Sequence, residues 1–328
     1  MPELSSVEKM ISDPVLSAFE LPLCRTFYPF GFPLQVETNS AEVIAAASEG
    51  WDAFDQTFDE VPVRLCLGVL QGSGDPLPPE SVFRSREHLM SIVADADNFI
   101  VCDFNRGFAF GWVVQSTVAD HPLLRYRFLT AAGATLVEQR AFAALHGALV
   151  SRNGTGMLFA GDSFAGKSTL AYACARSGWT YVTDDCALVS RRREDRYAVG
   201  DPHSIRFRPD APELFPELSD CLLTVRPNGK MAIEVLTRDL VVNTAPGCHV
   251  DHIVYLNREP GGKARISPVR KERIRKDWSR YNVVGTEDAR QARWRCHERM
   301  LSAQLWEMRY FDLDDAVARL ETLVDNGA

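Results

Sequence analysis

The stretch that decides the fold reads Gly161-Asp162-Ser163-Phe164-Ala165-Gly166-Lys167-Ser168. It matches G-x-x-x-x-G-K-[ST], a loop whose backbone N–H groups and lysine bind phosphate and whose last hydroxyl holds Mg²⁺. The apolar run Met157 to Ala160 precedes it and predicts a buried strand. The alanine-rich stretch Ser168 to Arg176 follows it and predicts a helix with its N-terminus toward the anion. The pattern predicts nucleotide binding by these eight residues and the adjoining Thr169.

The composition excludes several classes of protein. The chain has 328 residues, 46% apolar and 24% charged, which is typical of a globular protein with room for two domains. The net charge of −8 argues against nucleic acid or an anionic membrane as a partner. The stretch Met1 to Glu20 is acidic and has no long apolar core, so we expect neither a signal peptide nor a membrane span. We therefore expect a cytoplasmic protein.

Cysteine spacing points away from a metal or disulfide framework. The chain has eight cysteines, and none forms a C-x-x-C pair or stands beside a spaced histidine pair. Reduced cysteines are the simpler interpretation.

Residues 1–130 predict a separate α/β or α+β domain. A helix is expected over Ala41 to Trp51 with Asn39 or Ser40 as its cap, and a strand over Val61 to Leu67. Residues 98–104 and 108–114 predict a hairpin, and Gly72 to Pro79 a surface loop. Because no ligand signature stands out here, we expect this domain to set partner choice or assembly.

Residues 131–328 predict a second domain built around the phosphate loop. A helix is expected over Ala134 to Leu145, and a strand over His146 to Ser151. Asn153-Gly154 is a hairpin signal that returns the chain into the loop strand. Further strands are expected at 179–183, 186–189, 197–199, 205–207 and 252–256, and helices at 287–305 and 314–324. This pattern predicts an α/β sandwich.

An acidic pair, Asp184-Asp185, follows the apolar strand that ends at Thr183. In phosphate-loop proteins an acidic residue at a neighbouring strand end holds Mg²⁺. With two adjacent carboxylates, one can serve the metal while the other accepts a proton from a hydroxyl. We therefore predict a metal site from Ser168, Asp184 and Asp185. The alternative is a turn that only ends a strand.

A histidine stands at the start of the strand that leads into the hairpin. Because the hairpin closes back on the loop strand, His146 and the acidic pair are expected at the same sheet edge. A histidine there would orient a carboxylate or stabilise transferring charge. The alternative is a structural or surface histidine.

The order of these features resembles the catalytic domain of HPr kinase/phosphorylase. His-Gly, a hairpin, G-D-S-x-x-G-K-S and an Asp-Asp pair follow one another between His146 and Val189 with that family's spacings. The run Tyr310 to Val317 is similar to the closing helix of the wider HPr-kinase-like group, which includes peptide-modifying serine kinases. The resemblance implies an α/β fold with a P-loop catalytic domain of the HPr kinase (PEP carboxykinase-like) type and a separate N-terminal α+β domain.

The resemblance also implies roles for matching residues. Gly161 to Ser168 would bind ATP, with Lys167 stabilising the transferring phosphoryl group and Ser168 ligating Mg²⁺. Asp185 would take the proton from an acceptor serine, supported by Asp184 and His146. The implied activity is an Mg-ATP-dependent kinase acting on a serine of a protein or peptide, in a homo-oligomer.

Three positions depart from the family pattern. Thr169 replaces the glutamate that follows the loop in the bifunctional enzymes, and Ser204 replaces the metal-binding glutamate of L-E-[IV]-R-G-L-G. Pro268 to Lys271 only partly matches the segment tied to phosphorolysis. Phosphorylase activity is therefore not expected. A small-molecule kinase and a non-catalytic nucleotide-binding sensor remain alternatives, and the acceptor and the preferred donor among ATP, GTP and pyrophosphate stay open.

Two arginines lie close to the Ser204 position. Arg206 and Arg208 alternate on a predicted strand, so both are expected on one side of it. They could clamp phosphate or an acidic substrate, or lie on a solvated face.

Overall fold

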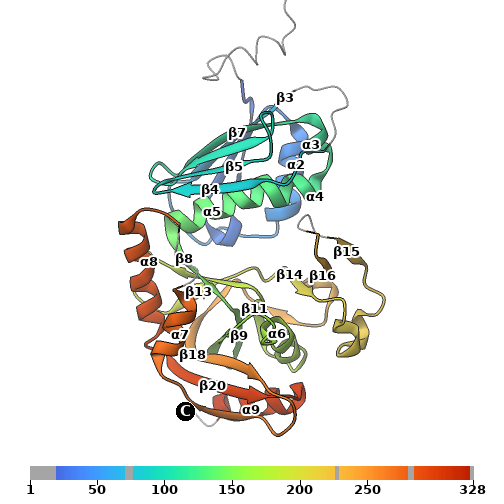
Figure 1. Cartoon of the computed structure of the whole chain (residues 1–328), viewed down its shortest axis with the longest axis vertical. Coiled ribbons are helices and arrows are strands. Elements are labelled where there is room, and N and C mark those ends of the chain that lie inside the picture. The colour runs from blue at the N-terminus through green and yellow to red at the C-terminus, as the bar shows by residue number, and fades with distance from the viewer. Residues whose placement is uncertain (1–19, 71–76, 226–228, 280–283, 326–328) are drawn as a thin grey trace, which may run out of the picture. The chain divides into compact units, whose positions relative to one another are not determined.

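The computed structural model describes residues 20–70, 77–225, 229–279 and 284–325. The protein is a mixed α/β chain that forms two compact units, one of Met1–Ala141 with Val284–Glu287 and one of Phe142–Val283 with Asp288–Ala328 (Figure 1). Most of the tract Met1 to Glu20 and of the predicted loop Gly72 to Pro79 lies outside the described residues. Among the described helices, none is both long and apolar enough to cross a membrane.

The N-terminal unit is a seven-stranded sheet with helices against one face. Its order is β1 (Leu23–Phe27), β2 (Leu34–Thr38), β3 (Val63–Leu70), β7 (Phe108–Val114), β6 (Phe99–Asp103), β5 (Leu89–Val93) and β4 (Val82–Arg86). Strands β2, β3 and β7 are parallel, and β7 to β4 form an antiparallel meander. The helical segments are η1 (Pro29–Gly31), α2 (Ala41–Trp51), α3 (Gln115–Ala119), α4 (His121–Leu124), η2 (Arg125–Leu129) and α5 (Thr130–Ala141).

The compact units divide after Ala141, whereas the sequence predicted a domain boundary between residues 130 and 131. Helix α5 lies in the N-terminal unit because it packs against β3, β7 and β6. Its apolar side chains, such as Leu136 and Val137, are fully buried there. Burial of this face stabilises the helix in that unit.

The C-terminal unit is built on a sheet through β18 (Gly247–Arg258). On one side of β18 lie β10 (Thr155–Ala160), β9 (Ala148–Arg152), β11 (Thr180–Thr183) and β17 (Asn243–Thr244). Its other edge pairs with β20 (Gln304–Tyr310), which pairs with β19 (Arg265–Pro268). The first residues of β18 also pair with β13 (Tyr197–Val199), which is followed by β12 (Cys186–Ser190) and β8 (Phe142–His146).

Strand direction brings the ends of four strands to one edge of this sheet. Strands β10 and β11 are both antiparallel to β9 and therefore run the same way. Strands β18 and β20 run parallel to β10. The carboxyl ends of β10 and β11 thus lie at the edge where β9 begins. The phosphate loop, the acidic pair and His146 are the segments that adjoin this edge.

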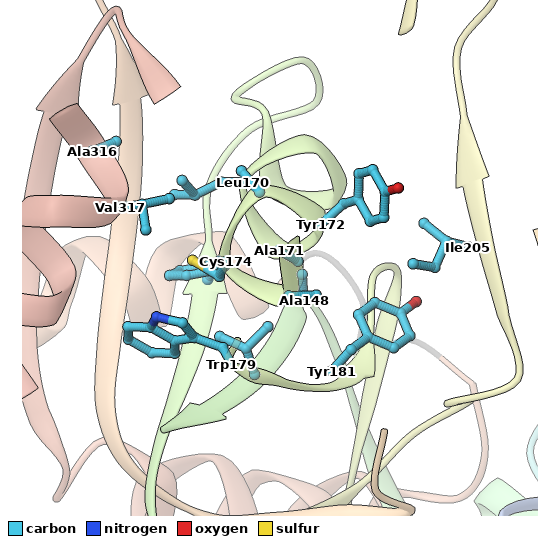
Figure 2. Close-up of a cluster of buried hydrophobic side chains, with 14 of the residues drawn as sticks. Ala148, Leu170, Ala171, Tyr172, Cys174, Trp179, Tyr181, Ile205, Ala316 and Val317 are labelled. Atoms are coloured by element: carbon cyan, nitrogen blue, oxygen red, sulfur yellow. The ribbon is translucent and has the colours of Figure 1, made fainter. Parts of the chain in front are cut away.

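Helix α6 (Lys167–Arg176) packs in the centre of a buried apolar cluster (Figure 2). On one side, Leu170 and Cys174 lie toward Ala316 and Val317 of α9 (Leu313–Asp325). On the other side, the Tyr172 ring packs edge-on against Phe207, with ring centroids 4.9 Å apart. Phe207 belongs to a small sheet of β14 (Ser204–Phe207), β16 (Met231–Leu236) and β15 (Leu223–Val225). The remaining α-helices are α7 (Lys271–Trp278) and α8 (Glu287–Met300), and short 3-10 helices are η3 (Ala211–Glu213), η4 (Pro216–Leu218) and η5 (Thr237–Asp239).

Two predicted helices end earlier than expected. Residues 142–145 belong to β8, and residues 304–305 begin β20. Phe142 and Leu145 belong to a short apolar run that fits the period of a helix or of a strand. The pairing of β8 with β12 makes this run a strand. The predicted strand 252–256 is the central part of the longer β18, and the predicted helix 314–324 is α9.

Trp179 offers a test of the α6 core. Its side chain is fully buried, and within the described residues its indole N–H has no hydrogen-bond partner. We expect Trp179→Ala to lower the free energy of unfolding by about 3–5 kcal/mol, since it leaves a cavity. Trp179→Phe should cost clearly less, because the phenyl ring leaves a smaller cavity and no hydrogen bond is lost. Denaturant unfolding measures both, with the half-exposed Phe311→Ala as control; equal losses in Trp179→Ala and Phe311→Ala would contradict the assignment.

Candidate active site

The phosphate loop joins β10 to α6 and turns at two glycines. Gly161 has φ +141°, and a Cβ there would lie 2.9 Å from the carbonyl oxygen of Leu256. Gly166 has φ +90°, and a Cβ there would collide with the Tyr310 hydroxyl. Tyr310 donates from that hydroxyl to the carbonyl of Ala165 at 2.8 Å. The loop backbone therefore requires glycine at both motif positions.

Lys167 begins helix α6 and folds back over the loop. Its Nζ donates to the carbonyls of Gly161 at 3.0 Å and Asp162 at 3.3 Å. Burial lowers the pKa of Lys167, against the opposing negative charges of Asp277, Asp185 and Asp162. The lysine is thus held at the loop, where phosphate oxygens could replace the two carbonyls as hydrogen-bond acceptors of its Nζ.

Asp184 is buried and connects three elements of the site. Its carbonyl oxygen accepts from the Ser168 hydroxyl at 3.3 Å, which ties β11 to the start of α6. Its Oδ1 accepts from the Tyr181 hydroxyl at 3.1 Å, and its Oδ2 from the backbone N–H of Arg206 in β14 at 3.3 Å. Burial, with the neighbouring charge of Asp185, raises the pKa of Asp184 to about 6.

Asp185 lies beside His146, which is the last residue of β8 and not, as the sequence predicted, the first residue of the hairpin strand. Its Oδ1 is 3.2 Å from His146 Nδ1, and its side chain is 59% exposed. Its carbonyl accepts from the N–H of Gly147 at 3.0 Å, and His146 pairs with Cys186 across β8 and β12. The exposed carboxylate of Asp185 can meet a molecule from solvent, whereas the Asp184 side chain is largely buried.

The other predicted loop residues line its outer side. Asp162, Ser163 and Phe164 are exposed, and Thr169 is partly buried in the first turn of α6. Asp162 accepts from the Tyr255 hydroxyl at 3.3 Å. Phe164 has φ +74°, a left-handed conformation that costs a non-glycine residue about 1 kcal/mol or more.

The two arginines near Ser204 contact different partners in the structure. Arg206 Nε lies 3.5 Å from Glu234 Oε2, so this arginine is paired within the small sheet. The guanidinium of Arg208 lies over the Phe164 ring, 3.9 Å from its centroid. Ser204 donates from its hydroxyl to Asp201 Oδ2 at 3.1 Å.

Sequence reasoning missed four side chains that support the site. Tyr181, Tyr255 and Tyr310 hydrogen bond to Asp184, Asp162 and the loop backbone, and the Asp277 charge acts on Lys167. Only Tyr181 had a local signal, since it lies in the strand that precedes the acidic pair. The others reach the loop from segments distant in sequence.

Metal-type side chains do not gather in the part of the chain that the structure describes, the predicted site of Ser168, Asp184 and Asp185 included. No group of three or more His, Cys, Asp or Glu residues suited to a metal ion occurs among the described residues. All eight cysteines are free thiols.

Comparisons with known proteins find matches among solved structures. No family model matches the chain, and no curated protein matches it. A solved structure, the HPr(Ser) kinase/phosphatase from Coxiella burnetii, matches with 13% identity over 56% of this chain and 99% of that chain, at a TM-score of 0.28. This likeness is weak and assigns neither a family nor an activity to the chain.

The contact between Gly166 and Tyr310 gives a double-mutant test. We expect Gly166→Ala to lower the unfolding free energy by about 2 kcal/mol, because the methyl group meets the hydroxyl and φ is left-handed. In a Tyr310→Phe background the same change should cost about 1 kcal/mol less. Denaturant unfolding of the four proteins measures the coupling. Strictly additive losses would contradict the predicted steric contact.

The raised pKa of Asp184 predicts a pH dependence of stability. The ordinary value is 3.8 and the folded value about 6, so between these the folded chain keeps a proton that the unfolded chain releases. The contribution of Asp184 to stability therefore falls as pH rises through this window, by up to about 3 kcal/mol. Asp184→Asn should lack this fall.

Unfolding free energies of wild type and Asp184→Asn between pH 4 and pH 7 measure the effect. The exposed Asp239→Asn is the control, and it should follow wild type. Parallel curves for wild type and Asp184→Asn would show that the Asp184 carboxyl titrates normally.

Proposed function

We propose that this protein is a kinase that transfers the γ-phosphoryl group of Mg-ATP to a hydroxyl, with a serine of a protein or peptide as acceptor. One observation carries the proposal. Lys167 and Ser168 of the loop, the Asp184-Asp185 pair and His146 meet at one edge of the C-terminal sheet. Such a combination of a phosphate loop with an exposed carboxylate suits phosphoryl transfer to a hydroxyl.

The donor half of the site is the loop and its lysine. Lys167 already lies against the carbonyls of Gly161 and Asp162, and its partly lowered pKa is restored by a nearby anion. Helix α6 adds its N-terminus to the same place. These groups would bind the β- and γ-phosphates and neutralise charge that develops on them.

The residues present fit a magnesium ion. The Ser168 hydroxyl and the Asp184 and Asp185 carboxylates are hard oxygen donors, which Mg²⁺ prefers. Because both oxygens of Asp184 already accept hydrogen bonds, we assign it the part of an outer ligand acting through water. When bound, Mg²⁺ would offset charge on the phosphates.

Asp185 is the proposed proton acceptor. Its carboxylate is exposed enough to meet an acceptor hydroxyl, and His146 Nδ1 lies 3.2 Å from its Oδ1. The imidazole would orient this carboxylate toward the hydroxyl. Asp184, buried behind it, would hold the end of β11 in place through Tyr181 and Arg206.

A second candidate is a non-catalytic nucleotide-binding sensor. Ser204 favours it, because its hydroxyl bonds to Asp201 at the position where the resembling family has a metal-binding glutamate. Loss of one metal ligand would weaken catalysis more than nucleotide binding.

Two variants of the full chain separate binding from transfer. Lys167→Ala should abolish measurable Mg-ATP binding by calorimetry. Asp185→Asn should bind Mg-ATP as wild type does but transfer label from γ-³²P-ATP to a serine peptide library at least about a hundredfold more slowly, because the proton acceptor is lost. Lys263→Ala changes an exposed lysine and is the control.

The outcomes distinguish the candidates. Wild-type transfer by Asp185→Asn would remove the proton-acceptor role. Tight Mg-ATP binding by wild type without transfer to peptides or metabolites would select the sensor, and transfer to a metabolite alone would select a small-molecule kinase. Absence of Mg-ATP binding by wild type would overturn the proposal.

A further inference from the structure

Phe164, at the tip of the phosphate loop, has an unfavourable backbone conformation and an exposed side chain. Its φ is +74°, in the left-handed region that favours glycine, and its side chain is 75% exposed. The left-handed backbone conformation costs an aromatic residue free energy, and a side chain this exposed gains little from burial to offset that cost. Strain of this kind is found where function needs it.

The exposed ring of Phe164 packs against the guanidinium of Arg208. Arg208 Cζ lies 3.9 Å from the ring centroid, so the planar group lies against the face of the ring. Stacking uses the face of a guanidinium and leaves the N–H donors at its edge available. The ring thus holds a cation at the loop without occupying its hydrogen-bond donors.

The backbone of Arg208 is anchored to the same helix that carries the loop. The preceding Phe207 is buried and packs against Tyr172 of α6 and against Phe215. The Arg208 carbonyl accepts from Ala211 N–H at 3.0 Å, and Pro209 restricts the Arg208 backbone. The Arg208 backbone, from which the guanidinium extends, is therefore fixed beside the loop.

Arg208 differs from Arg206 in its charge partners. Arg206 pairs with Glu234, but none of the ion pairs in the described part of the chain involves Arg208. A guanidinium fixed on the phosphate loop without a carboxylate suits an incoming anion, because its fork of donors matches phosphate oxygens.

We propose that Arg208 is a second phosphate-binding cation of the nucleotide site, aimed by the Phe164 ring beneath it. The inference rests on the proposed nucleotide site and adds a specificity residue to it. Lys167 binds the phosphates from inside the loop, whereas Arg208 binds them from the β14 side. Phe164 is a positioning residue, and its strained backbone turns the ring outward to Arg208.

Calorimetry with Mg-ATP tests Arg208. Arg208→Gln should raise the Kd about tenfold or more, as expected for one lost charge-assisted contact, and Arg208→Lys should fall between it and wild type. Arg238→Gln changes an arginine with an 80% exposed side chain and should leave the Kd unchanged. The decrease of affinity with added salt should be shallower in Arg208→Gln than in wild type.

Phe164 variants separate positioning from folding. Phe164→Gly should leave the Tm unchanged or higher, because glycine tolerates φ +74°, yet raise the Kd for Mg-ATP about threefold or more. Phe164→Trp keeps a platform for the guanidinium and should restore near wild-type binding.

Several results would overturn the inference. Wild-type Mg-ATP affinity in Arg208→Gln, or in Phe164→Gly, would do so, and an Arg208→Gln effect confined to the KM of the acceptor would assign Arg208 to that substrate instead. If wild type binds Mg-ATP and Lys167→Ala does not, the proposed site stands whatever Arg208 does. If wild type binds no Mg-ATP, both fail together.

Discussion

The buried Asp184 is the point at which the parts of the site are joined. Its backbone carbonyl contacts the loop helix through Ser168, and its carboxylate accepts from Tyr181 of β11 and from the backbone of β14. Burying a carboxyl group is costly, and the raised pKa of Asp184 reflects that cost. The hydrogen bonds offset part of it and fix the strand end that presents Asp185.

The contact between Asp184 and Arg206 also places β14 against the loop. From there Phe207 packs into the α6 core, and Arg208 reaches the Phe164 ring. The buried Asp184 thus connects Asp185 on one side of the site with Arg208 on the other side of the loop. Removal of the Asp184 carboxyl group should change the positions of both side chains.

Local signals in the sequence predicted the central part of this arrangement. The Asn153-Gly154 turn sets the antiparallel pairing of β9 with β10. Together with the pairings of β11 with β9 and of β8 with β12, it brings His146 near the end of β11. Contacts of high sequence separation were not predictable in this way. Tyr310 reaches Ala165 across 145 positions, and nothing in either segment indicates the other. The strand β8 was missed because its short apolar run suits either a helix or a strand until β12 pairs with it.

A crystal structure of the full chain with Mg²⁺ and a non-hydrolysable ATP analogue tests the central claim most directly. The account predicts the β- and γ-phosphates within hydrogen-bonding distance of Lys167 Nζ and of the loop N–H groups, with the Asp185 carboxylate facing the γ-phosphate. Phosphates bound away from the loop, or an Asp185 carboxylate turned from the γ-phosphate, would contradict it.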